Sequence, residues 1–386
     1  MPKAIPIRVE VKPTMLRWAR DRAGLDPDEL AHRFPKLTEW ERADILPTLK
    51  QLEDFARVTH VPIGYLFLPE PPVERVPSPD FRTVENRLVG RPSPDLLETI
   101  YLCQQRQEWY RDFARSVREE PRPFIGAATL QSVIEIVASE IRSALGFDIE
   151  ERGQCPTWTE ALRRFIEQAD KLGVLVMVNG VVGSNNYRKL NPDEFRGFAI
   201  SDELAPLVFI NGADTKAAQM FTLAHELAHL WLGQSALSDI EAVSAPTHQV
   251  ERWCNQVAAE LLVPLAIFRE HYRPGGELRA TLDRLARYFK VSTLVILRRM
   301  HDAGGFTENE LWQAYRAELA HLQEIQRVGS GGDFYLTLGA RVSKRFARAL
   351  VVNTLEGHTL HRDAFRLLGF SKHSTFRDLA HNLGIT

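Results

Sequence analysis

The sequence is poor in cysteine and has no long apolar run. Only three cysteines occur in 386 residues, at positions 103, 155 and 254, and none belongs to a C-x-x-C pair. An odd number of scattered cysteines does not build a disulfide framework and is typical of reduced thiols in a cytoplasm. No uninterrupted apolar stretch approaches the roughly 18 residues that cross a bilayer, and the N-terminal residues lack the apolar core of a signal peptide. We therefore expect a cytoplasmic protein that does not bind membranes.

The chain also lacks an excess of charge of either sign. It has 48 Lys and Arg against 50 Asp and Glu, a formal net charge of -2. Such a chain has no global attraction for a polyanion, so contact with nucleic acid would need a local basic patch. The length exceeds that of one compact core, and we expect two or three domains.

Proline, glycine and the apolar periodicity divide the chain into segments. The segment 69–80 has five prolines in twelve residues, which excludes a helix or a central strand. Apolar residues that recur at spacings of three and four residues predict long helices over 95–118 and 128–145. Short β-branched runs predict strands within 173–183 and 205–212. From about residue 275 to the end the pattern is again helical, apart from a glycine-rich break at 329–332.

One short motif carries most of the chemistry. His225, Glu226 and His229 form H-E-x-x-H inside a stretch that Asp214 or Thr215 could cap. Histidines four apart on a helix lie on the same face and can bind one ion through their ring nitrogens. Glu226 is offset around the helix, where a general base for water is needed. A lone histidine on an apolar helix is more often a core residue than a metal ligand. This motif specifies three residues at fixed spacing, which favours a metal site.

A third ligand is needed, because catalytic zinc sites usually have three protein ligands. A second predicted helix, 250–264, offers Glu251 and Glu260. We favour Glu251 because Asn255, one turn later, lies on the same face and can hydrogen-bond a ligand. His248 and Tyr272 are possible partners for the oxyanion, and that role stays open.

The order of strands and helices over residues 196–233, followed by 251–264, resembles the ImmA/IrrE family of zinc-dependent metallopeptidases. The resemblance covers about residues 173–264. It implies an α+β, predominantly helical fold with a zincin-like core and a small sheet. Members of this family are typically encoded with, or fused to, helix-turn-helix regulators, and the best understood ones cleave a repressor.

The resemblance also implies roles for individual residues. His225, His229 and Glu251 correspond to the ligands of Zn²⁺, and Glu226 corresponds to the catalytic base. The strand before the motif helix is expected to be an edge on which an extended substrate peptide adds by main-chain pairing; its residues are Leu207, Val208, Phe209, Ile210 and Asn211.

The first 72 residues resemble the helix-turn-helix of phage-type (XRE-type) repressors. Only eight residues separate Ala31 from Trp40, whereas about a dozen lie between the matching positions in those repressors. About one turn of the reading helix is therefore missing. The segment also has 11 basic and 11 acidic residues, which is poor for phosphate attraction. We expect it to dock a partner or its own peptidase domain, and we doubt that it reads DNA bases.

Residues 276–301 are a second candidate for DNA binding. Six basic side chains face two acidic ones there, a net charge of +4, and the alternative is a solvated face of a packing module. The basic residues are Arg279, Arg284, Arg287, Lys290, Arg298 and Arg299.

Together these observations predict four parts and one main activity. The parts are a helix-turn-helix-like domain (1–72), a proline-rich linker and helix (73–125), a zinc metallopeptidase domain (126–274) and a C-terminal helical module (275–386). The predicted activity is that of a regulatory zinc endopeptidase that cleaves a protein partner, such as a repressor or toxin encoded nearby. The alternative is a non-catalytic or weakly catalytic, antitoxin-like transcription regulator.

Overall fold

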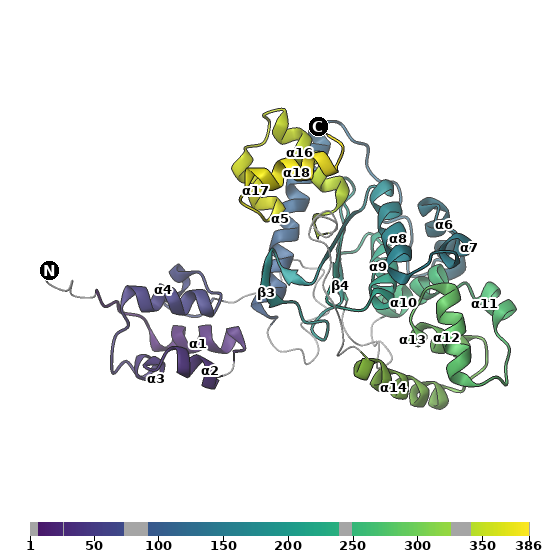
Figure 1. Ribbon diagram of the computed structural model, residues 1–386, viewed down its shortest axis with the longest axis horizontal. Coiled ribbons are helices and arrows are strands. Elements are labelled where there is room, and N and C mark those ends of the chain that lie inside the picture. The colour runs from purple at the N-terminus through teal and green to yellow at the C-terminus, as the bar shows by residue number, and fades with distance from the viewer. Residues whose placement is uncertain (1–6, 26, 73–91, 239–248, 326–340, 386) are drawn as a thin grey trace. The chain divides into compact units, whose positions relative to one another are not determined.

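A computed structural model describes residues 7–25, 27–72, 92–238, 249–325 and 341–385 (Figure 1). The fold is α+β and predominantly helical, as the sequence predicts. The chain forms two compact units, one made of the described residues up to 98 and the other of those from 99 onward. No helix of the described segments combines the length and the apolar character that a membrane crossing requires.

The first unit is a small helical domain with its own core. Phe34, Trp40 and Phe55 pack against one another with ring centroids 5.5 to 6.5 Å apart. Thr48 and Gln51 form a capping box that starts the fourth helix. The third helix has only five residues, so the segment where a reading helix would lie is short. The elements are α1 (Pro13–Ala23), α2 (Pro27–Arg33), α3 (Leu37–Glu41), α4 (Leu49–Val58) and the 3₁₀ helix η1 (Ile63–Phe67).

The second unit contains a four-stranded sheet in the order β1-β5-β4-β6. β1 is parallel to β5, and the other two pairings are antiparallel. The strands are β1 (Leu175–Asn179), β4 (Gly197–Ile200), β5 (Leu207–Asn211) and β6 (Ala236–Ser238), and a separate hairpin joins β2 (Val181–Val182) to β3 (Asn185–Lys189).

The prediction that Leu207–Asn211 is an edge strand is wrong. β5 lies between β1 and β4, and Leu207 is paired with Leu175 on one side and with Ile200 on the other. Its main-chain hydrogen bonds are therefore used on both sides. All five of its residues are buried, which is the pattern of a strand covered on both faces. The edges of this sheet are β1 and β6.

Helices cover both faces of the sheet. Successive side chains of a strand point to opposite faces, so the buried strands present apolar side chains on both sides. Val176 and Val208 join the core cluster that includes the inner faces of α8 (Trp158–Leu172) and α9 (Lys216–Trp231). On the other face, Met177 contacts Cys103 of α5 (Pro94–Ser116), their sulfur atoms 4.0 Å apart. Figure 1 shows α5 and the C-terminal helices on the side of the sheet away from α8 and α9.

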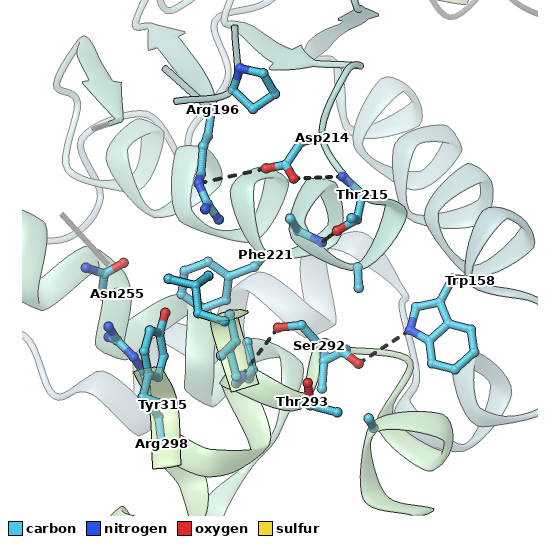
Figure 2. A pocket seen from close by; sticks show the side chains of 18 of the residues that line it. Trp158, Arg196, Asp214, Thr215, Phe221, Asn255, Ser292, Thr293, Arg298 and Tyr315 are labelled. Carbon is cyan, nitrogen blue, oxygen red and sulfur yellow. Dashed lines mark hydrogen bonds and ion pairs between the residues drawn. The ribbon is translucent and has the colours of Figure 1, made fainter. Parts of the chain in front are cut away.

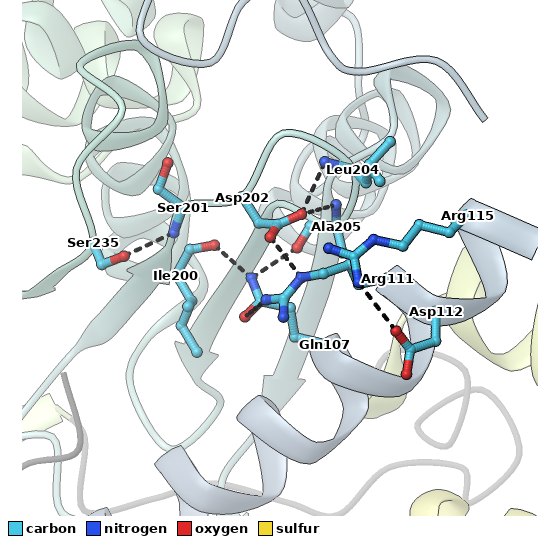
Figure 3. A network of polar contacts seen from close by, with 10 residues as sticks. All are labelled: Gln107, Arg111, Asp112, Arg115, Ile200, Ser201, Asp202, Leu204, Ala205 and Ser235. Atoms are coloured by element: carbon cyan, nitrogen blue, oxygen red, sulfur yellow. Dashed lines mark hydrogen bonds and ion pairs between the residues drawn. The ribbon is translucent and has the colours of Figure 1, made fainter. Parts of the chain in front are cut away.

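A polar network attaches α5 to the turn between β4 and β5 (Figure 3). Gln107 Nε2 donates to the carbonyl oxygens of Ile200 and Ala205 at 3.0 and 2.8 Å. Arg111 Nε lies 2.7 Å from Asp202 Oδ2, and Asp202 Oδ1 accepts the N–H groups of Leu204 and Ala205. These contacts fix the strand pair that precedes α9.

The helices after the sheet share its core, so residues of the predicted domains 126–274 and 275–386 pack together. The helix predicted over 128–145 begins only at Ile134. The glycine-rich break at 329–332 lies outside the described residues. The remaining helices are α6 (Ile134–Leu145), α7 (Ile149–Gly153), α10 (Gln249–Leu262), α11 (Leu265–His271), α12 (Leu278–Phe289), α13 (Thr293–Asp302), α14 (Glu308–Ile325), α16 (Lys344–Leu355), α17 (His361–Leu368) and α18 (His373–Asn382).

The last three helices are anchored on α8, on α5 and on the residues just after α5 by buried and partly buried polar contacts. Ser343, the N-cap of α16, donates from Oγ to Asp170 Oδ1 of α8 at 2.8 Å. Arg345 Nη2 lies 2.8 Å from Glu119 Oε2. Arg106 of α5 donates to the carbonyl oxygen of Leu367, at the end of α17. Helices α16 to α18 are thus held from both α8 and α5.

Candidate metal centre

The motif helix α9 begins and ends where the sequence predicts. Thr215 is the N-cap, and its Oγ1 accepts the N–H of Ala218 at 3.2 Å. Gly233, just past the end, has φ of +70°, a conformation that favours glycine. Every residue from Thr222 to Trp231 is buried, so this helix lies inside the unit and its polar side chains need partners.

The structure brings two histidines of α9 and one glutamate of α10 together. His225 Nε2 and His229 Nε2 are 3.0 Å apart. Glu251 Oε2 lies 3.1 Å from His225 Nε2, and Glu251 Oε1 lies 3.3 Å from His229 Nε2. Among the described residues, these three are the group of His, Cys, Asp and Glu side chains whose spacing suits a metal ion.

The spacing of these atoms fits a tetrahedral ion. Ligand atoms about 2.0 to 2.1 Å from a zinc ion lie about 3.3 to 3.4 Å from one another when the angles are tetrahedral. The two nitrogens are 3.0 Å apart, and each lies 3.1 or 3.3 Å from a different oxygen of the Glu251 carboxylate. Two imidazoles and one carboxylate are also a donor set that zinc accepts in catalytic sites. The residues present therefore fit zinc.

Asn255, on the same face of α10 as Glu251, orients one of the histidines. Its Oδ1 lies 3.0 Å from His225 Nδ1. An amide oxygen accepts a hydrogen bond, so Nδ1 carries a proton, and in the neutral ring Nε2 is then the nitrogen with the lone pair. The amide thereby selects the tautomer that a metal ligand requires.

Burial and the close contacts within this group shift the pKa values of its three side chains. Burial would raise the pKa of Glu251, but hydrogen bonds from His225 and His229 hold it well below its usual range. Burial acts to lower the pKa of His225, yet the contact with Glu251 raises it overall. Burial lowers the pKa of His229, which favours the neutral ring. The carboxylate is thus ionised, as a ligand must be.

Glu226 is fully buried beside this group, where α9 approaches β4 closely. A Cβ atom added at Gly197 of β4 would lie 2.5 Å from Thr222 Cγ2 and 3.3 Å from Glu226 Oε1. Only glycine therefore permits this distance between helix and sheet, and the carboxylate of Glu226 lies against the strand. Burial raises the pKa of the Cys254 thiol of α10, and the negative charges of Glu251 and Glu226 raise it further.

Glu260, the rival ligand, has a different partner. Its Oε2 lies 2.7 Å from Arg299 Nη2, and both side chains are at least nine-tenths buried. Its carboxylate oxygens also lie 3.3 Å from the N–H of Leu265, at the start of α11. Glu260 therefore belongs to a buried ion pair between α10 and α13 and does not join the histidines.

The prediction of a basic face at 276–301 is wrong for two of its residues. Arg299 is buried against Glu260, and Lys290 is buried with its Nζ 5.4 Å from the ring centroid of Trp158. Neither can reach a phosphate backbone. Arg279 lies 2.9 Å from Glu318 Oε2, which offsets its charge.

The oxyanion role remains unassigned. Tyr272 packs on Phe268, with ring centroids 5.4 Å apart, and a Cβ at Gly305 would lie 2.4 Å from its hydroxyl oxygen. This places Tyr272 against the α13–α14 connection. His248 lies outside the described residues.

Comparison with known protein families agrees with this geometry over part of the chain. Residues 169–301, about a third of the sequence, match the model of the IrrE N-terminal-like domain (Peptidase_M78). Residues 342–382 match a domain of unknown function, DUF8813. A comparison with curated proteins found no match. The family match supports the ImmA/IrrE resemblance for the segment that contains the candidate metal centre.

Proposed function

We propose that this protein is a zinc-dependent endopeptidase that holds its ion with His225, His229 and Glu251. The observation that carries the proposal is a group of three side chains on two packed helices: the two Nε2 atoms are 3.0 Å apart, and the Glu251 carboxylate lies 3.1 Å from His225 Nε2 through one oxygen and 3.3 Å from His229 Nε2 through the other. The Peptidase_M78 match over residues 169–301 supports it. A bound zinc ion would supply the Lewis acidity that activates water and polarises the scissile carbonyl.

The residues of the chain supply orientation and proton transfer. Asn255 keeps the His225 ring in its ligand orientation. Glu226 acts as the general base: it takes a proton from the attacking water and passes it to the nitrogen of the leaving amine. The buried walls around α9 limit competing water. A protein that only binds partners does not need this second carboxylate beside the ligand group.

The substrate we propose is a protein partner, such as a repressor or toxin encoded nearby, and the role we propose is regulatory. Main-chain pairing of a substrate would use an edge of the sheet, and the edges are β1 and β6.

The test uses purified, zinc-loaded protein and candidate repressors and toxins encoded beside it. We expect a single cleavage of one candidate, and none with Glu226→Gln protein that still binds one zinc per chain. Cleavage that persists after zinc is removed and shown to be absent would contradict the proposal. The proposal would also be contradicted if the protein bound no zinc and cleaved none of the candidate proteins.

A further inference from the structure

A cavity of about 700 Å³ lies beside the N-terminal half of α9 (Figure 2). Its walls come from α9, the segment before β4, the turn between α12 and α13, and α14. This volume is within the range of about 300 to 1,000 Å³ that is typical of ligand pockets. None of the proposed metal ligands lines it, and the chemistry proposed above does not use it.

One end of the cavity adjoins the metal centre. Asn255 lines the cavity and also contacts His225. Phe221 lines it and precedes His225 by one helical turn, with the two ring centroids 6.4 Å apart. A polypeptide whose scissile bond lies at the metal centre would therefore place the residues on one side of that bond in this cavity.

The end nearest the metal centre is aromatic. Figure 2 shows Phe221 and Tyr315 on the same side of the cavity as Asn255. The Arg298 guanidinium lies 5.4 Å from the Tyr315 ring centroid, which holds that ring between α13 and α14. Ala217 and Ala218 line the α9 wall and leave space in front of it. Aromatic walls with small neighbours favour a large apolar side chain over a charged one.

The opposite wall is preformed. Ser292 caps α13, and its Oγ accepts the N–H of Val295 at 3.4 Å. Trp158 Nε1 donates to the carbonyl oxygen of Val291 at 3.4 Å, and Thr293 Oγ1 donates to Glu318 Oε1 at 2.5 Å. Because these groups already have partners, the cavity keeps its shape without a ligand, and binding costs less ordering.

A polar pair lines another part of the wall, near the start of α9. Arg196 Nε and Asp214 Oδ2 are 3.8 Å apart, longer than a hydrogen bond, and Asp214 Oδ1 accepts the N–H of Thr215 at 2.7 Å. The pair joins the segment before β4 to the one after β5 (Figure 2). Three aspartates and three arginines line the cavity, so their formal charges sum to zero and the cavity selects neither an acidic nor a basic ligand; they are Asp193, Asp214, Asp283, Arg196, Arg287 and Arg298. A peptide main chain, which offers both donors and acceptors, suits such a site.

We propose that this cavity is a substrate subsite that binds an extended peptide segment and seats a large apolar side chain against Phe221 and Tyr315. This inference rests on the proposed function, because the position of the scissile bond defines the subsite. It assigns α12, α13 and α14 to substrate selection.

The test blocks the cavity from its small-residue wall. Ala218→Trp fills part of the cavity from the third position of α9. The matched control is Ala280→Trp. Ala280 occupies the third position of α12, is exposed and does not line the cavity. Both variants are made in zinc-loaded Glu226→Gln protein, which prevents turnover. The probe is a random decapeptide library, and the bound peptides are sequenced by mass spectrometry.

We expect the parent and Ala280→Trp to enrich peptides with Phe, Tyr, Trp, Leu or Met at one position at least tenfold. Ala218→Trp should lose this enrichment at least tenfold while its zinc content and thermal unfolding match the parent. If Ala218→Trp does not fold, Ala217→Leu takes its place. Enrichment that survives the block, enrichment of charged residues alone, or no bound peptide overturns the subsite.

Failure of the proposed function gives a different pattern. If wild-type, zinc-loaded protein leaves the selected peptides intact but the block still abolishes selection, hydrolysis is refuted and the peptide site stands. If wild-type and Ala218→Trp proteins with intact Glu226 cleave the same substrate at equal rates with the same sequence preference, hydrolysis stands and the subsite is refuted.

Discussion

Removal of the Glu260 carboxylate is a sharp test of which glutamate serves the metal. Glu260→Ala leaves Arg299, whose side chain is 6% exposed, without its closest partner. Removing one member of a buried ion pair costs about 3 to 5 kcal/mol, because the remaining charge stays desolvated. Arg299 keeps Asp302 at 3.0 Å, but that side chain is 40% exposed. We therefore expect a loss of about 3 kcal/mol in the free energy of unfolding.

The assay combines urea unfolding with a zinc competition titration against a chelator. Glu260→Ala should be less stable and bind zinc as tightly as the wild type, whereas Glu251→Ala should lose zinc. A double variant, Glu260→Ala with Arg299→Met, should regain most of the stability, since it removes the stranded charge. A folded Glu260→Ala protein that loses zinc would refute the assignment, as would a stability loss below about 1 kcal/mol.

Three further predictions concern the base, a buried carboxyl group and the N-terminal unit. Glu226→Gln should keep about one zinc per chain by metal analysis and lose hydrolysis, because it removes the proton acceptor and no ligand; loss of zinc would assign Glu226 to the ligand shell. Burial raises the pKa of Asp170 from 3.8 to about 6, so the protonated form is favoured in the folded state. The resulting stabilisation of the folded state is fully present below about pH 3.8 and is lost as the pH rises through about 6, a change of about 3 kcal/mol in the free energy of unfolding. Urea unfolding at pH 4 and 7.5 should show this loss in the wild type and not in Asp170→Asn. The same change of unfolding free energy with pH in both proteins would contradict it. Finally, the full chain should not bind one duplex sequence through residues 1–72 a thousandfold more tightly than random DNA at physiological salt; specific binding that is lost with Lys36→Ala and Thr38→Ala would show that α3 reads bases.

Local features of the site follow from the sequence. The helical spacing of His225 and His229 depends only on the α-helix itself, and the caps at Thr215 and Gly233 mark the ends of that helix. The E-x-x-x-N spacing likewise puts Glu251 and Asn255 on one face of α10. These relations lie within single helices, so packing does not change them.

The tertiary structure decided everything that depends on which elements meet. A short apolar strand has the same sequence pattern whether it pairs with one neighbouring strand or two, so only the strand order of the sheet shows that β5 is central. Formal charges likewise do not show that Arg299 and Lys290 are buried, because burial depends on partners from α10 and α8. The cavity beside α9 joins residues from Trp158 to Leu319, and no local pattern predicts it. Periodicity and spacing are short-range properties of the chain, whereas neighbours in a sheet, burial of charge and enclosed space arise from contacts between residues far apart in sequence.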